Sequence, residues 1–186
     1  MTTETLTTTL TGDYDLDAAH SRVGFAAKHA MVTTVRGAFK TFTGEAHLDE
    51  SDVTKSSARI EIEAASSDTG NADRDNHVRN SDFLEVEKYP TMTFVSTSAV
   101  QNGDDDFVLN GDLTIRDITK PVSIDFEQTG AAVDPWGNFR VGFEGKAKIN
   151  RTDWGVDFNA PLGAGGLVIS EKVNLEFDIA AVRRAS

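Results

Sequence analysis

Eight segments of this chain alternate apolar and polar residues, and none of them has the pattern of a long helix. The clearest covers residues 138–150, where Phe139 and Phe143 share one face and Arg140 and Glu144 share the other. This is the pattern of a strand that faces water on one side only. We therefore expect an all-β protein. The same period of two predicts the other strands at residues 22–29, 42–48, 59–64, 92–94, 107–115, 122–127 and 173–179.

Short turn-forming sequences separate these strands, among them residues 102–104 and 134–138. Connections of this length join neighbouring strands that pair antiparallel. Strands in this order would leave long unpaired edges unless the first pairs with the last. The pattern therefore predicts an eight-stranded antiparallel up-and-down β-barrel.

One long interruption of the strand pattern predicts a short helix near residues 72–84. Its N-cap is expected to be Asn71 or Asp73, because short polar side chains satisfy the free N–H groups of a first turn. At 186 residues and with no composition shift that would mark a linker, the chain is predicted to form one domain. We place this domain at residues 13–183, after a flexible, Thr-rich N-terminus of residues 1–12.

The chain has a formal net charge of -12 and contains no cysteine. Nucleic acids and anionic membrane surfaces attract Lys and Arg, so neither is an expected partner. Disulfides, thiolate catalysis and cysteine-based zinc sites are excluded together. No apolar run has the length of a membrane-spanning helix, and residues 1–12 lack the basic and apolar regions of a secretory signal. We predict a cytoplasmic protein that does not span a membrane, or an exported one if a leader has been removed.

The apolar face of the strands is expected to point into the barrel. Aromatic residues are scattered along mid-strand positions, whereas an outer-membrane barrel gathers them in girdles. Such an interior is either filled by side chains or holds one small ligand. Small residues with inward parity, such as Gly111 and Gly145, fit the taper of the barrel or leave space, so both alternatives stay open here. With ~3.3 Å per residue and a tilt of ~45°, residues 138–150 give a barrel roughly 30 Å tall, which suits a long, thin, apolar guest.

Four polar side chains are candidates for contact with the head group of such a guest. His29 has the inward parity of its strand, so it is either a core histidine bonded to a backbone carbonyl or a ligand contact. The helical segment supplies Arg74, His77 and Arg79, whose positive charges would hold a phosphate, whereas a quinone carbonyl would need only a donor such as His29. No metal site is predicted, because Asp75 and His77 are two residues apart and would not share a helix face.

Short motifs follow one another along most of the chain. They are Leu-Asp-Ala-Ala-His-Ser at 16–21, Val-Arg-Gly-Ala-Phe at 35–39, Arg-Asp-Asn-His at 74–77, Asp-Phe at 82–83, Lys-Tyr-Pro at 88–90, Gly-Asp-Leu-Thr-Ile-Arg at 111–116, Thr-Lys-Pro-Val at 119–122 and Asn-Arg-Thr-Asp-Trp-Gly at 150–155. In this order they resemble the motifs of one bacterial family, the YceI-like, polyisoprenoid-binding, lipocalin-like domains. The resemblance implies an elongated, lipocalin-like, eight-stranded barrel with an additional helix, holding an isoprenoid chain such as a polyprenyl phosphate or a quinone tail.

We therefore predict a protein that binds, carries or stores a long-chain isoprenoid lipid, with no enzymatic activity and no cofactor. Two alternatives stay open: an enzyme acting on such a lipid through Arg74, His77 and His29, and a ligand-free barrel that serves a stress response or an interaction. A homodimer also stays open. Trp154 stands where the family commonly has Phe and would shorten or reshape the cavity if it faced inward. The predicted ligand contacts are Phe25, His29, Phe42, Arg74, His77, Arg79, Phe83, Phe94, Leu113, Phe126, Phe143, Trp154 and Phe177.

Overall fold

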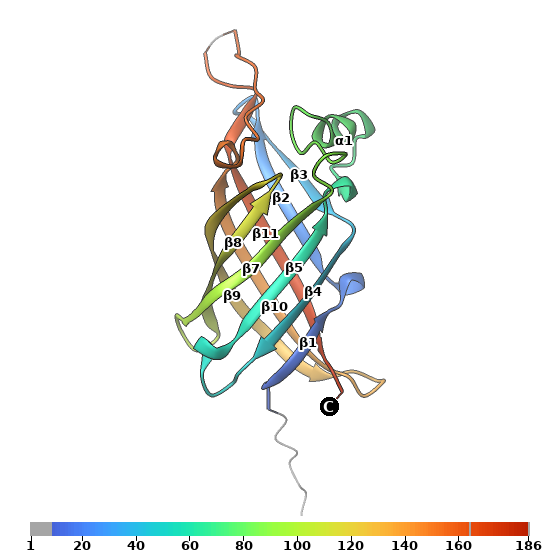
Figure 1. Ribbon diagram of the computed structural model, residues 1–186, viewed down its shortest axis with the longest axis vertical. Helices are drawn as coiled ribbons and strands as arrows, with labels where there is room; N and C mark the ends of the chain where they lie inside the picture. The colour runs from blue at the N-terminus through green and yellow to red at the C-terminus, as the bar shows by residue number, and fades with distance from the viewer. Residues whose placement is uncertain (1–8, 164, 186) are drawn as a thin grey trace, which may run out of the picture.

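The protein is a closed, elongated β-barrel with one α-helix beside its upper end (Figure 1). The computed structural model describes residues 9–163 and 165–185. The closed ring is antiparallel and runs β1, β4, β5, β7, β8, β9, β10, β11 and back to β1, which confirms the predicted eight-stranded barrel. The strands are β1 (Gly12–Leu16), β2 (Arg22–His29), β3 (Thr33–Phe39), β4 (Phe42–Leu48), β5 (Ser57–Glu63), β6 (Ser67–Asp68), β7 (Thr91–Gln101), β8 (Asp106–Ile115), β9 (Ile118–Val133), β10 (Phe139–Asn150) and β11 (Ile169–Arg183).

The order of the strands departs from a simple meander near the N-terminus. A short 3-10 helix, η1 (Ala18–His20), separates β1 from β2, and the Asp17 side chain caps it by accepting a hydrogen bond from the Ala19 N–H. As a result β1 pairs with the C-terminal end of β11, and β2 pairs with the preceding part of β11 and then with β3. β4 pairs with β1 and not with β3, so β4 and the strand before it in the chain are not neighbours in the sheet.

The eight predicted strands correspond to β2, β4, β5 and β7 to β11, while β1, β3 and β6 were not predicted. In β3 the inward position between Val35 and Phe39 is Gly37, so the apolar alternation is interrupted. β1 is only five residues long, with two aspartates among them. Short or glycine-interrupted strands carry too few apolar positions for the period of two to stand out.

The helix α1 (Ala72–Arg79) ends five residues before the predicted boundary. Asn71 is its N-cap and accepts a hydrogen bond from the Arg74 N–H at 3.0 Å. Among the described residues, no helix is long and apolar enough to cross a membrane. Two further short helices are η2 (Val53–Lys55) and η3 (Ala64–Ser66), and a third, η4 (Arg151–Trp154), follows β10 at the upper end.

Internal hydrogen bonds fasten α1 to the segment before it. Asp75 is buried, and its carboxylate accepts bonds from the N–H and hydroxyl of Thr69 at 2.7 and 2.6 Å. Burial opposes its charge, but these bonds and the positive charges of Arg79 and Arg74 keep its pKa below the ordinary value. Arg79 in turn donates to two backbone carbonyls of the segment that precedes the helix, those of Ala65 at 2.8 Å and Ser67 at 2.9 Å.

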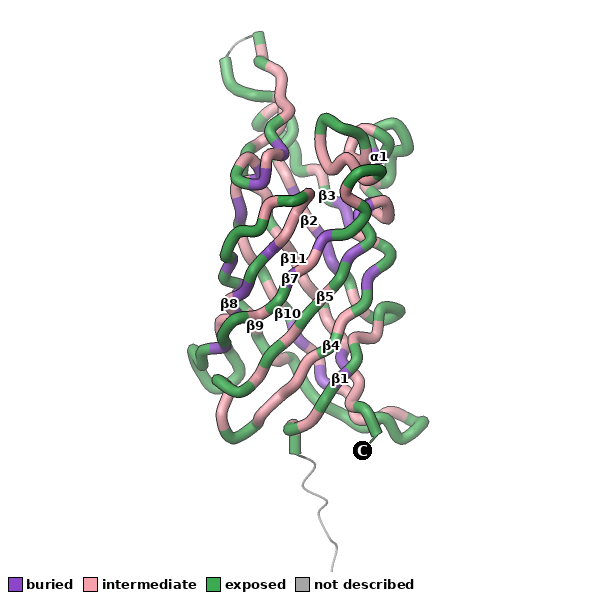
Figure 2. Tube along the Cα trace, in the orientation of Figure 1, coloured by how far each residue is buried: buried purple, intermediate pink, exposed green. Residues whose placement is uncertain are grey.

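Buried residues follow the barrel wall, whereas the turns at both ends are exposed (Figure 2). At the lower end Tyr14 is completely buried, and its hydroxyl donates to the Leu10 carbonyl at 2.7 Å. Val141, Phe143 and Ala181 form a buried cluster with it. The lower end of the barrel is therefore packed with side chains, and the helix lies at the opposite end.

Candidate functional site

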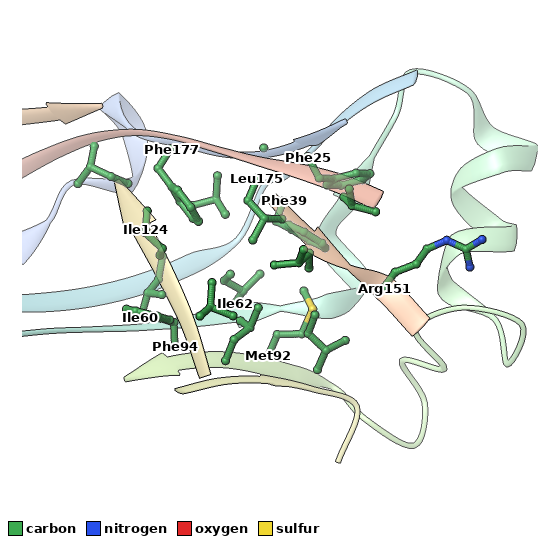
Figure 3. Close-up of a pocket in the computed structure, with 18 of the residues that line it drawn as sticks. Phe25, Phe39, Ile60, Ile62, Met92, Phe94, Ile124, Arg151, Leu175 and Phe177 are labelled. Carbon is green, nitrogen blue, oxygen red and sulfur yellow. The ribbon is translucent and has the colours of Figure 1, made fainter. Parts of the chain in front are cut away.

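The barrel encloses a cavity of about 670 Å³. This volume lies in the range of ~300–1,000 Å³ typical of ligand pockets. Apolar side chains from opposite sides of the barrel, among them Phe25, Phe94 and Phe177, point toward one another across the space (Figure 3). The alternative of an interior filled completely by side chains is therefore excluded. The apolar face of the strands points inward, as the sequence predicts.

Three glycines on the inner wall are covered by phenylalanine rings of neighbouring strands. Phe25 lies over Gly37, its partner on β3, and Phe126 lies over Gly145, its partner on β10. Phe94 of β7 covers Gly111 of β8, although Phe94 is paired with Leu113. A Cβ added at any of the three would fall well inside van der Waals contact with the ring. The inward glycines therefore let aromatic rings lie flat against the wall and keep the middle of the lumen open.

Gly145→Ala is expected to destabilise the protein by about 1–3 kcal/mol, because the new methyl group displaces the Phe126 ring. That ring cannot move freely, because it stacks on the Phe107 ring and packs against the Phe177 ring, with distances of 5.6 and 5.9 Å between ring centroids. Gly130→Ala on β9 is the matched control, because an added Cβ there meets nothing within 4 Å. Urea unfolding of both variants measures the difference, and equal stabilities would contradict the assigned role of the glycine.

We call the upper end of the cavity the mouth. An aromatic cluster lies there. The His77 ring of α1 meets Phe83 and Phe158 edge-on at centroid distances of 4.8 and 4.9 Å, and the two phenylalanines are 5.4 Å apart. His77 Nε2 lies 2.9 Å from Asp82 Oδ2. All three rings line the cavity. The segment after η4 and the segment around α1, far apart in the sequence, therefore meet at the mouth through edge-to-face contacts.

Arg151 is a buried cation on the cavity wall, with 6 % of its surface exposed (Figure 3). Burial lowers the pKa of the guanidinium, although the charges of Glu171 and Asp157 oppose this. Among the described residues, no carboxylate lies within ion-pair distance of it. Arg151 therefore fixes the segment after η4 against the start of β11, through backbone carbonyls alone. Its guanidinium donates to the carbonyls of Ser170, Val156 and Ile169 at 2.9, 2.7 and 3.3 Å.

Most of the predicted ligand contacts lie together on the cavity wall, and three do not. Phe42 is buried in a cluster with Val23 beside the cavity. Trp154 is also buried, and its indole N–H donates to the Leu113 carbonyl at 2.9 Å, so it packs within the wall and does not line the cavity. Arg79 is held by the carbonyls before α1. The residues found on the wall are Phe25, His29, Arg74, His77, Phe83, Phe94, Leu113, Phe126, Phe143 and Phe177.

His29 is exposed at the upper end of β2 and lines the cavity. The interpretation as a core histidine is therefore wrong, and a contact with a ligand at the mouth stays a prediction. Arg74 also lines the cavity, but it donates to the Thr69 hydroxyl at 2.7 Å and the Thr69 carbonyl at 2.8 Å. In the described part of the chain, no group of three or more His, Asp or Glu side chains is arranged to hold a metal ion.

Sequence reasoning missed two residues of the mouth, Phe158 and Arg151. Phe158 lies in an irregular segment without alternation, so no periodic signal marks it. Arg151 is part of the Asn-Arg-Thr-Asp-Trp-Gly motif at residues 150–155, which was the available signal. A motif alone does not show that its arginine is buried against a cavity.

The fold and the site define a class of protein, a small lipocalin-like barrel whose interior is open and apolar. The chain belongs to the YceI-like domain family, whose model matches residues 14–181. A UPF0312 protein of Photorhabdus laumondii is 37% identical over 169 residues, covering 91% of this chain and 84% of the relative. A UPF0312 protein of Vibrio parahaemolyticus is 34% identical over 166 residues, covering 88% of this chain and 86% of the relative. Neither of these two relatives carries the name of an enzyme.

Solved structures share the same barrel. The Campylobacter jejuni YceI protein matches with a TM-score of 0.74 and 28% identity, covering 85% of this chain and 90% of the other. BcnA of Burkholderia cenocepacia matches in fold with a TM-score of 0.77 and 24% identity, over 89% and 98% of the two chains. A polyisoprenoid binding domain from Saccharophagus degradans matches in fold with a TM-score of 0.70 and 16% identity, over 92% and 98%.

Proposed function

We propose that this protein binds a long-chain isoprenoid lipid inside the barrel, either a polyprenyl phosphate or an isoprenoid quinone, and carries or stores it. The observation that carries the proposal is the open lumen of about 670 Å³ with an apolar wall. Burial of apolar surface contributes roughly 25 cal/mol per Å², whereas a polar group buried without a partner costs about 1–3 kcal/mol. A long hydrocarbon tail therefore fits this lumen better than a polar metabolite does.

The shape of the barrel supports an extended tail. The cavity reaches from His77 at the mouth to Tyr14 near the packed lower end. Linear tails can follow such a lumen along its whole length, whereas a compact ligand of the same volume would leave part of the wall uncovered. One solved structure of this fold is described as a polyisoprenoid binding domain, and we extend that class of ligand to this chain.

The polar head of the lipid belongs at the mouth in this proposal. His29, Arg74 and His77 line the cavity there, and Arg151 adds a buried positive charge. These side chains would donate hydrogen bonds to phosphate oxygens or to a quinone carbonyl. The proposal includes no chemical step. The cytoplasmic location and the homodimer stay predictions.

Native mass spectrometry of protein purified without detergent tests the proposal. We expect an additional mass that organic solvent releases and that corresponds to a lipid with a long prenyl chain. Apo protein incubated with such a lipid is expected to regain the same mass. Protein that neither retains nor takes up a prenyl lipid would overturn the proposal, and recovery of a chemically altered lipid would favour the enzyme alternative.

A further inference from the structure

Two segments at the upper end contain no charged residue, although 26% of the chain is Asp, Glu, Lys or Arg. One is the β2–β3 connection, where residues 29–35 read His-Ala-Met-Val-Thr-Thr-Val. The other is the segment before β11, where residues 159–170 contain neither an acid nor a base. The two are joined, because the Ala30 N–H donates to the Val168 carbonyl at 2.7 Å. The segment before β11 projects beyond the barrel rim, and the β2–β3 connection lies at the base of this projection (Figure 1).

Large apolar side chains are exposed on this projection. Met31 is 64% exposed, Val32 is 77% exposed and Leu167 is 36% exposed. We call residues 30–32 with residues 161–163 and 165–167 the mouth tip. Apolar side chains that gather on an exposed projection gain nothing from contact with water. An exposed cluster of this kind therefore marks an interaction surface.

The turn that presents these side chains is strained. Ala30 and Met31 have φ of 51° and 62°, and the Val32 N–H donates to the His29 carbonyl at 3.0 Å. This is the geometry of a tight hairpin turn with two left-handed central residues, in which Asn-Gly is the favoured pair. Residues with a Cβ are unfavourable in this conformation. The chain therefore keeps an apolar methionine at a position where glycine would stabilise the turn. Backbone strain of this kind is found at functional sites.

We propose that the mouth tip docks the protein on a lipid bilayer, with its apolar side chains inserted at the boundary between head groups and acyl chains. The inference rests on the proposed function, because a prenyl lipid is stored in membranes and must pass between bilayer and barrel. The mouth tip is continuous with the cavity wall, since His29 and Val168 adjoin it and line the cavity. Docking in this orientation brings the mouth to the bilayer, so a tail enters the barrel without crossing water.

The charges around the mouth tip favour a neutral bilayer over a strongly anionic one. Lys28 and Arg36 flank the first segment, and Asp157 and Glu171 flank the second, so the flanking side chains carry no net charge. The whole chain carries -12. Attraction to anionic lipids needs clustered basic residues, and no residue of the mouth tip itself is basic. Insertion of the apolar side chains therefore has to supply the binding energy.

Sedimentation with phosphatidylcholine vesicles tests the docking in the full chain. Wild-type protein is expected to bind these vesicles at least as well as vesicles that also contain phosphatidylglycerol. Replacing Met31, Val32 and Leu167 together by Ser is expected to weaken binding roughly tenfold or more, because three apolar side chains no longer insert. Binding that required the anionic lipid would overturn the proposal.

A second variant separates docking from folding. Ala30→Asn with Met31→Gly supplies the favoured turn, so it is expected to raise the midpoint of thermal unfolding while weakening vesicle binding. The matched control is Trp136→Ser at the opposite end of the barrel, where the indole is 82% exposed in the β9–β10 turn. This control is expected to bind vesicles like the wild type.

Each outcome has a definite meaning. Vesicle binding that is unchanged in the stabilised turn variant, or lost equally in the tryptophan control, would overturn docking through the mouth tip. So would a mouth tip that only joins two copies of the chain, seen as a dimer that the serine substitutions dissociate, without vesicle binding. Uptake of soluble short prenyl alcohols is measured separately, so a failure of docking and a failure of lipid binding are distinguishable.

Discussion

Affinity for a series of prenyl alcohols is expected to rise steeply with tail length and then to level off. Each buried carbon of the tail contributes roughly 0.8 kcal/mol, so an added five-carbon isoprene unit contributes up to about 4 kcal/mol, or nearly a thousandfold in affinity. The gain ends when the lumen of about 670 Å³ is full and further carbons stay in water. Displacement of a fluorescent apolar probe by each alcohol measures the series.

Head-group variants of equal tail length provide the control for this series. An alcohol and the corresponding phosphate are expected to show the same dependence on tail length, because the tail occupies the same wall in both. Their offset in affinity measures the mouth alone, where His29, Arg74 and His77 lie. An affinity that did not change with tail length would show that the protein does not recognise the tail, and the carrier proposal would then lose its physical basis.

Leu175→Trp is expected to lower the affinity for long tails by about 100-fold or more while leaving the barrel folded. Leu175 lies on β11 opposite Phe25 and points into the middle of the lumen (Figure 3). The larger indole occupies space that a tail would use, and the open cavity accepts it without the strain of an overpacked core. The same displacement assay measures the loss, and urea unfolding checks that stability changes by less than about 1.5 kcal/mol.

The neighbouring residue supplies a matched control for the blocked lumen. Asn174 is exposed on the outer face of the same strand, so Asn174→Trp adds the same indole outside the barrel. This variant is expected to bind long tails like the wild type. Short prenyl alcohols are expected to lose less affinity than long ones in Leu175→Trp, because they cover less of the wall. Unchanged binding of long tails in Leu175→Trp would place the ligand outside the lumen.

The alternation of apolar and polar residues determined much of this protein by itself. Successive side chains on a strand point to opposite faces, so the pattern around Phe139 and Phe143 states which face is buried. Eight such patterns with short turns between them leave closure as the way to avoid open edges. The long interruption near residues 72–84 located the helix, and the sequence narrowed its N-cap to Asn71 or Asp73, of which the structure has Asn71. These properties are local or follow from strand order, and for that reason they can be read without coordinates.

The tertiary structure alone decided which of the inward-facing residues line the cavity. Inward parity placed Phe25 and Phe42 alike, but only Phe25 reaches the cavity, because Phe42 packs against neighbours from other strands. The residue on the neighbouring strand decided whether each inward glycine leaves space in the lumen or is covered by a phenylalanine ring. Strand parity is a property of one segment, whereas an empty volume is a property of all the strands at once.

The mouth shows the same division. Composition indicated positive charge around α1, but the structure directs Arg79 to backbone carbonyls and brings Arg151 and Phe158 to the cavity from a distant segment. Polar side chains go where unsatisfied carbonyls and buried surface are found, and those positions exist only after the chain has closed. The sequence by itself therefore determined the barrel, its apolar interior and its family, and the tertiary structure decided which side chains form the cavity and its mouth.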